Sequence, residues 1–203
     1  ARTTHILGMD EAYEDIRNAV LDAALPEIAF DGWSEDVLAR AGEASGIDEN
    51  SLHLAFSGGV GDLIAAFSSQ GDVAMLAALD KPDDMKIRDR IRHAVRVRLE
   101  VDTDHREAAR CAAGWLSLPG RQALGGRLIY ATADHIWHWA GDKATDYNHY
   151  SKRLMLSGVL GATRLVWFGD ESDGNEKSWA FLDRRIENVM QFEKAKAKWQ
   201  AAS

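Results

Sequence analysis

The chain has 203 residues, of which 46% are hydrophobic and 28% charged, and its formal net charge is −8. This is the composition of an ordinary globular protein, and it excludes disordered and collagen-like chains. A single cysteine, Cys111, cannot form an internal disulfide, which indicates a reducing, cytoplasmic setting. Residues 1–13 hold no apolar run after a basic start, so we expect no secretory signal; uncharged apolar stretches such as residues 154–163 are about half as long as a membrane span.

Charge is unevenly distributed along the chain. Residues 1–80 contain three basic and fifteen acidic residues, whereas residues 81–203 contain 21 basic and 17 acidic ones. We therefore expect two sub-regions, a strongly acidic first part and a mildly basic second part.

Helix signals recur through the sequence, while alternating strand patterns are scarce. Apolar spacing and capping residues predict an all-α fold of about nine helices. The predicted helices cover residues 10–30, 34–41, 48–56, 62–79, 84–101, 104–118, 121–140, 147–168 and 177–199. Ser34, Asp48, Asp83 and Asp104 are the expected N-terminal caps, and Pro119 with Gly120 ends the sixth helix.

The first three predicted helices have the lengths and order of a helix-turn-helix. The pattern is Ser34-x-x-Val37-Leu38-x-x-Ala41-Gly42, then Ile47-Asp48, then Ser51-Leu52-x-x-Ala55-Phe56. It resembles the DNA-binding head of the TetR family. That resemblance implies a helix-turn-helix head over residues 1–60, a helical ligand-binding and dimerisation bundle over residues 61–203, and a homodimer formed through the last two helices.

The charge of the head argues against DNA. Residues 34–80 contain one basic residue, Arg40, against eight acidic ones, and the predicted reading helix begins with Asp48 and Glu49. A helix-turn-helix draws much of its affinity from neutralising phosphates. We therefore predict that the chain binds no nucleic acid, and we keep a TetR-type transcriptional regulator with a small apolar ligand as the alternative function.

The second half carries a more specific resemblance. The relevant stretches are residues 140–153, AGDKATDYNHYSKR, then Asp170-x-Ser172, and Trp179-x-Phe181-Leu182-Asp183-x-Arg185-Ile186-x-x-Val189-Met190. Together they resemble the ubiquinone-biosynthesis accessory protein family (the ninth Coq protein and its bacterial relatives), whose members have a TetR-like fold and bind lipid.

This resemblance implies a non-catalytic protein that holds an isoprenoid lipid or quinone precursor and presents it to a partner, a di-iron demethoxyubiquinone hydroxylase. It also implies a partner-binding surface at positions matched one by one: Asp134, Ile136, Asp146, His149, Tyr150 and Arg153. His149 stands where the family commonly has tryptophan, so a smaller ring with a titratable charge occupies that position.

The residues themselves favour an apolar binding site in the same region. The predicted helices 121–140 and 147–168 contain glycines at a cost of about 1 kcal/mol each relative to alanine, and the second is apolar nearly all round. Close helix packing is the simpler explanation of the glycines, and room for a ligand chain is the functional alternative. The expected lipid-binding residues are Met155, Leu156, Val159, Leu160, Gly125, Gly126, Gly158 and Trp167.

No pattern indicates catalysis, a cofactor or a metal. His135 and His138 share a helix face near Asp134, but Glu-x-x-His pairs and paired cysteines are missing from the sequence. Nucleophile and nucleotide-binding motifs are missing as well, so we predict that the protein is not an enzyme. The lysines at 194, 196 and 198 spread around their helix. A solvated helix end and a weak peripheral contact with the inner membrane are therefore both compatible with the sequence.

Overall fold

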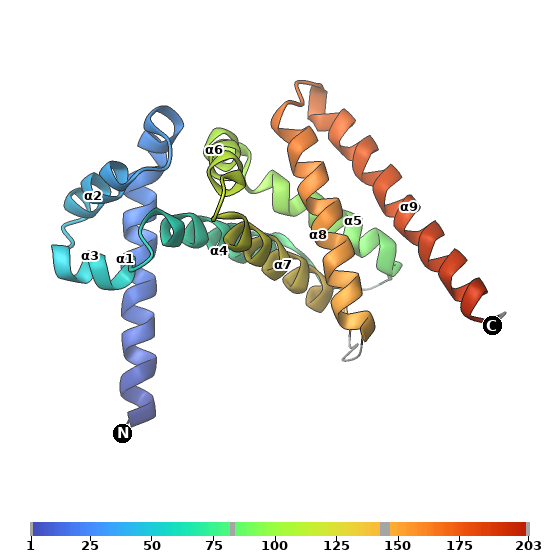
Figure 1. Ribbon diagram of the computed structural model, residues 1–203, viewed down its shortest axis with the longest axis horizontal. Helices are drawn as coiled ribbons and strands as arrows, with labels where there is room; N and C mark the ends of the chain where they lie inside the picture. The colour runs from blue at the N-terminus through green and yellow to red at the C-terminus, as the bar shows by residue number, and fades with distance from the viewer. Residues whose placement is uncertain (1, 82–83, 143–146, 202–203) are drawn as a thin grey trace. The chain divides into compact units, whose positions relative to one another are not determined.

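The computed structural model describes residues 2–81, 84–142 and 147–201, and within these ranges the fold is all-α. The helices are α1 (Arg2–Asp31), α2 (Glu35–Ala44), α3 (Glu49–Ala55), α4 (Val60–Ala78), α5 (Ile87–Glu100), α6 (Arg106–Ser117), α7 (Gln122–Trp139), α8 (Tyr147–Phe168) and α9 (Glu176–Ala201) (Figure 1). Two short 3₁₀ turns, Thr103–His105 and Asp173–Asn175, precede α6 and α9. The predicted fold class is confirmed.

Helix starts follow the predicted caps at α2 and α3. The Ser34 hydroxyl accepts a hydrogen bond from the backbone N–H of Val37 at 3.3 Å, and the Asp48 carboxylate accepts one from Ser51 N–H at 3.1 Å. Each side chain satisfies one of the N–H groups that a first helical turn leaves without an intrahelical partner.

Other helix starts differ from the predictions. Helix α1 begins eight residues earlier than the predicted residue 10. The predicted cap Asp83 lies outside the described residues, and α5 begins at Ile87, after Lys86. Asp104 belongs to the 3₁₀ turn, so α6 begins one residue later than a helix capped by Asp104 would. The boundary at residue 60 between the helix-turn-helix head and the helical bundle stays a prediction.

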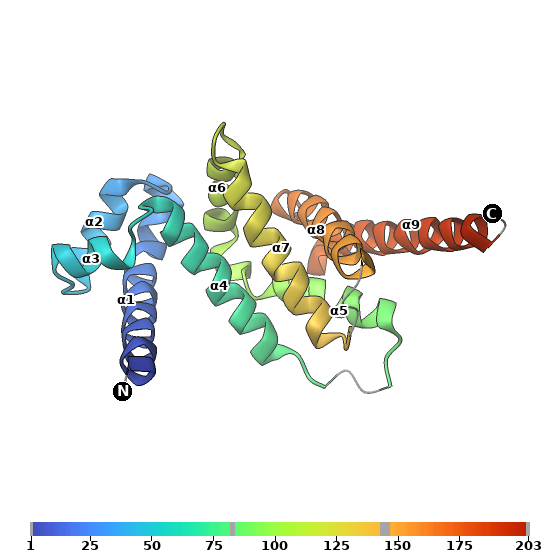
Figure 2. The same cartoon turned by 60° about the horizontal axis from the view of Figure 1, so that its bottom comes forward.

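Residues 1–73 and 104–125 form one compact unit. Helices α2 and α3 lie against α1 in both views (Figures 1 and 2). Arg17 of α1 donates to the Ala55 carbonyl at 2.9 Å, and the Trp33 indole donates to the Ala108 carbonyl at 2.9 Å. The first bond ties α1 to α3, and the second ties Trp33, two residues beyond α1, to α6. Both lie around a core that includes Leu21 and Ile28.

Residues 74–103 and 126–203 form the second unit. Helices α8 and α9 run side by side as a hairpin, and α5 contacts both (Figure 1). The core of this unit is a single cluster of buried apolar residues: Met75, Ile91, Ala94, Val95, Val97, Leu99, Ala133, Ile136, Ala140, Leu156, Val159, Leu160, Trp167, Trp179, Leu182 and Ile186. Within it, the buried Arg98 guanidinium donates to the Asp102 carboxylate at 2.7 Å.

The turn between α8 and α9 is organised by Asp170. One carboxylate oxygen accepts from the N–H and hydroxyl of Ser172 at 2.9 and 2.5 Å, and the other accepts from the N–H and hydroxyl of Ser178 at 2.7 and 2.6 Å. The hydrogen bonds from Ser172 and Ser178 hold the pKa of Asp170 well below its ordinary value. Asp170 therefore fixes the start of α9 against the end of α8.

Candidate functional site

The second unit contains a cavity of about 350 Å³, formed by side chains of α5, α7, α8 and α9. This volume lies in the lower part of the range usual for small-molecule sites. Most of its wall is apolar: Ile87, Ile91, Met155, Leu156, Val159, Ile186 and Val189. These seven side chains are uncharged, so this part of the wall suits a hydrocarbon chain.

A second hollow of about 360 Å³ continues between α8 and α9. Its lining includes Met155, Val159 and Val189, which also line the first cavity, so the two adjoin. Gly158 and Ala162 form the next part of the α8 wall. Positions 155, 158, 159 and 162 share one helix face, which gives the two hollows a common wall along α8.

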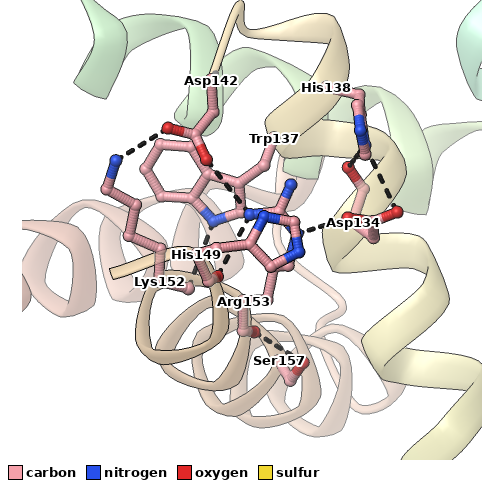
Figure 3. A network of polar contacts seen from close by, with 8 residues as sticks. All are labelled: Asp134, Trp137, His138, Asp142, His149, Lys152, Arg153 and Ser157. Carbon is pink, nitrogen blue, oxygen red and sulfur yellow. Dashed lines mark hydrogen bonds and ion pairs between the residues drawn. The ribbon is translucent and has the colours of Figure 1, made fainter. Parts of the chain in front are cut away.

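Three lining residues of the first cavity, Trp137, Asp142 and Lys152, form a polar cluster that we call the polar end of the cavity (Figure 3). The Lys152 ammonium donates to the Asp142 carboxylate at 2.7 Å and lies 5.3 Å from the centre of the Trp137 ring. The indole N–H of Trp137 in turn donates to the Lys152 carbonyl at 3.2 Å. Trp137 and Lys152 therefore hold the end of α7 against the first turns of α8.

Arg153 lies beneath this end, with 1% of its side chain exposed. Its guanidinium donates to the Asp134 carboxylate, to the Asp142 carboxylate at 3.1 Å and to the His149 carbonyl at 3.1 Å. Burial acts to lower the pKa of Arg153, but the hydrogen bonds to Asp134 and Asp142 outweigh it and raise that pKa. Arg153 thus connects α7, the residues that follow it and α8 (Figure 3).

Four of the eight predicted lipid-binding residues line the two hollows. Met155, Leu156 and Val159 line the first cavity, and Gly158 lines the second. Whether a lipid contacts them stays a prediction.

The other four line neither hollow. Leu160 and Trp167 are fully buried in the core, because the remaining apolar faces of α8 pack against neighbouring helices. A Cβ at Gly125 would lie 3.3 Å from Leu116 Cβ, so this glycine serves close packing in the first unit. A Cβ at Gly126 would meet nothing within 4 Å.

The predicted partner-binding residues divide by exposure. Tyr150 is 60% exposed, and its ring meets the half-buried His149 edge to face at 5.0 Å between centroids. Asp134 is partly exposed and contacts His138 at 3.3 Å. These three residues have surface that a partner could reach.

Ile136 and Arg153 do not fit the prediction of partner contact, because both side chains are buried. Ile136 belongs to the apolar core, and Arg153 is enclosed by its carboxylate partners. Both residues therefore lie beneath the predicted partner-binding surface and hold its helices in place. Asp146 lies outside the described residues.

No local sequence pattern predicts the polar end of the cavity. Asp142 and Lys152 stand within the stretch 140–153 that carries the family resemblance, and Trp137 belongs to none of the motifs. Ile87 and Ile91 share one apolar face of a predicted helix, but the sequence does not show which helix packs against that face. Their convergence depends on how α5, α7 and α8 pair, which no local pattern encodes.

Neither a metal-binding cluster nor a membrane-spanning helix occurs among the described residues. No three His, Cys, Asp or Glu side chains in that part of the chain come together as a metal site requires. Among the described helices, none combines the length and apolar character needed to cross a membrane.

Comparison with known proteins points to one family. The COQ9 family model matches residues 123–193, which contain nearly all of α7, all of α8 and most of α9. The ubiquinone biosynthesis protein COQ9-A, mitochondrial, of Xenopus laevis is 30% identical over 189 residues, covering 89% of this chain and 59% of that protein. The COQ9 proteins of Rattus norvegicus and Homo sapiens are 30% and 28% identical, with 60% and 59% of their lengths covered. The chain thus spans about three fifths of these curated relatives.

A solved structure supports the fold. The crystal structure of a TetR transcriptional regulator from Nitrosomonas europaea matches with a TM-score of 0.64 at 20% identity, covering 87% of this chain and 99% of that one. At this identity the match concerns the fold alone, and it confirms the predicted TetR-like architecture. Together with the sequence matches, it confirms that the chain resembles the ubiquinone-biosynthesis COQ9 family.

Proposed function

We propose that this relative of the COQ9 proteins takes part in ubiquinone biosynthesis as a non-catalytic lipid-binding protein. In this role it holds an isoprenoid quinone precursor in the cavity between α5, α7, α8 and α9. The observation that carries the proposal is the apolar cavity of about 350 Å³ within the region that the family model covers. Met155, Leu156 and Val159, which the sequence alone suggested, contribute to its wall.

The energetics suit a long apolar chain. Each buried methylene contributes about 0.8 kcal/mol, so ten of them contribute on the order of 8 kcal/mol. Association costs on the order of 4–15 kcal/mol in lost freedom. A tail of this size therefore roughly offsets the cost of binding, and net affinity depends on further carbons in the adjoining hollow or on contacts to the head.

The same proposal includes a partner. Tyr150 and Asp134 offer exposed surface close in sequence to the polar end of the cavity at Lys152 and Asp142. We assign this surface to the hydroxylase that would receive the lipid head. Because bilayers are the source of such lipids and the curated relatives are named as mitochondrial proteins, we place the working protein at the periphery of an inner membrane.

Lipid content tests the proposal. Protein purified without detergent should yield, on organic extraction and mass spectrometry, an isoprenoid lipid at a substantial molar ratio. The variant Val159→Trp places a larger side chain in the wall that the two hollows share. It should lose that lipid while keeping its helical circular dichroism. Tyr150→Ala should keep the lipid and lose capture of the hydroxylase from the same organism. Wild-type protein that yields no lipid above the level of Val159→Trp would refute lipid binding.

A further inference from the structure

We propose that Arg90 is a positioning residue of the cavity. It holds the first turn of α5 against the end of α7, and these two segments form the mouth through which a ligand enters and leaves. Because the cavity is taken as a ligand site, this role rests on the proposed function. It concerns access to the cavity, whatever the head of the ligand, and it belongs to a side chain that is not part of the cavity wall.

Exposure marks where the cavity opens to the surface. Ile87 is 46% exposed and the Arg88 side chain 47%, and both line the cavity from the first turn of α5. Gly141, two residues beyond α7, is exposed as well and lines the same cavity. Other lining residues, such as Leu156, are buried. The start of α5 and the end of α7 therefore both belong to the mouth.

Two hydrogen bonds of the Arg90 guanidinium connect these segments. Its Nε donates to the Met85 carbonyl at 2.8 Å, and its Nη1 donates to the Ala140 carbonyl at 2.8 Å. Met85 lies two residues before α5, and Ala140 directly follows α7. Because both acceptors are backbone carbonyls, the bonds fix the course of the main chain. One side chain therefore holds together the entry to α5, α5 itself and the end of α7.

The end of α7 leaves a carbonyl for this donor. Gly141 has a φ of +90°, and its N–H and that of Asp142 each donate to a carbonyl of the last turn, of residues 138 and 137, at 3.0 Å. This is the Schellman pattern of helix ends. The Ala140 carbonyl, for which a helix end provides no intrahelical partner, accepts from Arg90. A cation at this end also interacts favourably with the helix dipole.

The mouth depends on this tie more than the wall does. Ile91 and Leu156 line the cavity and belong to the buried core of the second unit, so packing holds them in place. Ile87 and Arg88 are nearly half exposed and have less packing to hold them. Loss of Arg90 should therefore loosen the mouth and leave the apolar wall intact. Because the wall provides the affinity, ligands should enter and leave faster with little change in the dissociation constant.

Exchange of a neutral apolar fluorescent probe, N-phenyl-1-naphthylamine, tests this role. Its association and dissociation rate constants would be measured by stopped-flow fluorescence with the whole, delipidated chain. Arg90→Met should raise both rate constants by about 10-fold, as loss of a charge-assisted hydrogen bond implies. The dissociation constant should change by less than about 3-fold. Arg90→Lys, which keeps the charge but not the fork that reaches two carbonyls, should give intermediate rate constants.

Arg96→Met is the matched control on the same helix. The Arg96 guanidinium lies 4.7 Å from the centre of the Trp179 ring and pairs with Glu100 at 3.7 Å, and neither of these partners lines the cavity. This variant should exchange the probe at the wild-type rates. Val159→Trp should weaken binding of the probe, because residue 159 lies in the wall that the two hollows share.

Amide hydrogen exchange adds a readout that needs no ligand. In Arg90→Met, residues 85–90 and 138–142 should exchange faster, while residues 176–182 at the start of α9 should exchange as in the wild type. Faster exchange throughout the chain would mean that Arg90 only stabilises the fold, and it would overturn the role at the mouth.

Failure of this role and failure of lipid binding give different results. If Arg90→Met exchanges the probe no faster than wild type or Arg96→Met does, or if its dissociation constant rises as much as its dissociation rate constant, Arg90 does not position the mouth, while binding in the cavity stands. If wild-type protein does not bind the probe, or if Val159→Trp binds it equally well, the proposed function fails, and the role of Arg90 at a ligand mouth fails with it.

Discussion

The guanidinium of Arg153 satisfies two carboxylates that come from different parts of the chain, Asp134 on α7 and Asp142 beyond its end. Asp142 has 6% of its side chain exposed, so its charge depends on these partners. Removing one member of a buried ion pair leaves an uncompensated charge, which costs more than the pair contributes. We therefore expect Arg153 to stabilise the fold whether or not a partner is bound.

We expect Arg153→Met to lower the free energy of unfolding by about 3 kcal/mol. Arg153→Lys, which keeps the charge and loses the planar fork, should lie between this variant and the wild type. Tyr150→Ala, three residues away on the exposed surface, should change stability by less than about 0.5 kcal/mol. Urea unfolding followed by circular dichroism measures all three, and an Arg153→Met protein as stable as Tyr150→Ala would contradict the buried network.

Asp170 gives a pH-dependent prediction. Its pKa in the folded protein lies below the unfolded value of about 3.9 because Ser172 and Ser178 donate to the carboxylate. The stabilisation is therefore complete above the unfolded pKa and is lost as the pH falls through the folded pKa. Asp170→Asn, which does not ionise, should differ from wild type most at pH 6 and progressively less at pH 4 and pH 3. Urea unfolding at the three pH values tests this, and a constant difference would refute it.

At the scale of the helix, two glycines of α8 differ in what surrounds them. A Cβ at Gly158 would meet nothing within 4 Å, whereas a Cβ at Gly161 would lie 3.1 Å from Ile129 Cδ1. Gly158→Ala should therefore raise the free energy of unfolding of lipid-free protein by up to about 1 kcal/mol. Gly161→Ala should gain less or lose stability, because Ile129 has to move. Equal gains in urea unfolding would show that Gly161 is not a packing glycine.

The first turn of α4 bears on the prediction that the head binds no DNA. The Glu35 carboxylate accepts from the Val60 N–H at 3.1 Å, and the Asp62 carboxylate accepts from the Gly58 N–H at 2.6 Å. Backbone N–H groups at a helix start are natural phosphate ligands. Here carboxylates of the chain itself occupy two of them, and Arg40 is paired with Glu27. These contacts support the prediction that this TetR-like head binds no nucleic acid.

Helix positions were largely predictable from the sequence because caps and apolar spacing are local signals. Ser34 and Asp48 cap the helices that they were expected to cap. Exposure was less predictable, since a helical period tells which residues share a face but not which face is covered. For this reason Ile136 and Arg153 were assigned to a surface although they are buried.

For the same reason, the sequence predicted only some of the residues that line the cavity. Helix α8 is apolar on several faces, which suggested Met155 and Val159 together with Trp167. Only the pairing of α8 with α9 and α5 separates the residues of the cavity wall from those of the core. Ile87 and Ile186 lie about a hundred residues apart in the chain, so their meeting in one wall is a property of the tertiary fold.

For the whole molecule, we propose a homodimer that uses the outer face of α8. Leu154 and Leu165 are 64% and 68% exposed, unusual for leucine on a helix otherwise packed in the core. The double variant Leu154→Glu, Leu165→Glu should sediment as a monomer and keep its helical content, whereas wild type should sediment as a dimer. A monomeric wild-type protein at micromolar concentration would contradict the dimer.

Photo-crosslinking would show whether a lipid binds between α5, α8 and α9. A ubiquinone analogue with a diazirine in its isoprenoid tail would be incubated with the protein, irradiated and mapped by peptide mass spectrometry. We expect labels on residues 155–162 of α8 and 186–189 of α9, suppressed by unlabelled ubiquinone and weakened in Val159→Trp. Labels confined to residues 1–73, or labelling no stronger than on an unrelated helical protein, would contradict it.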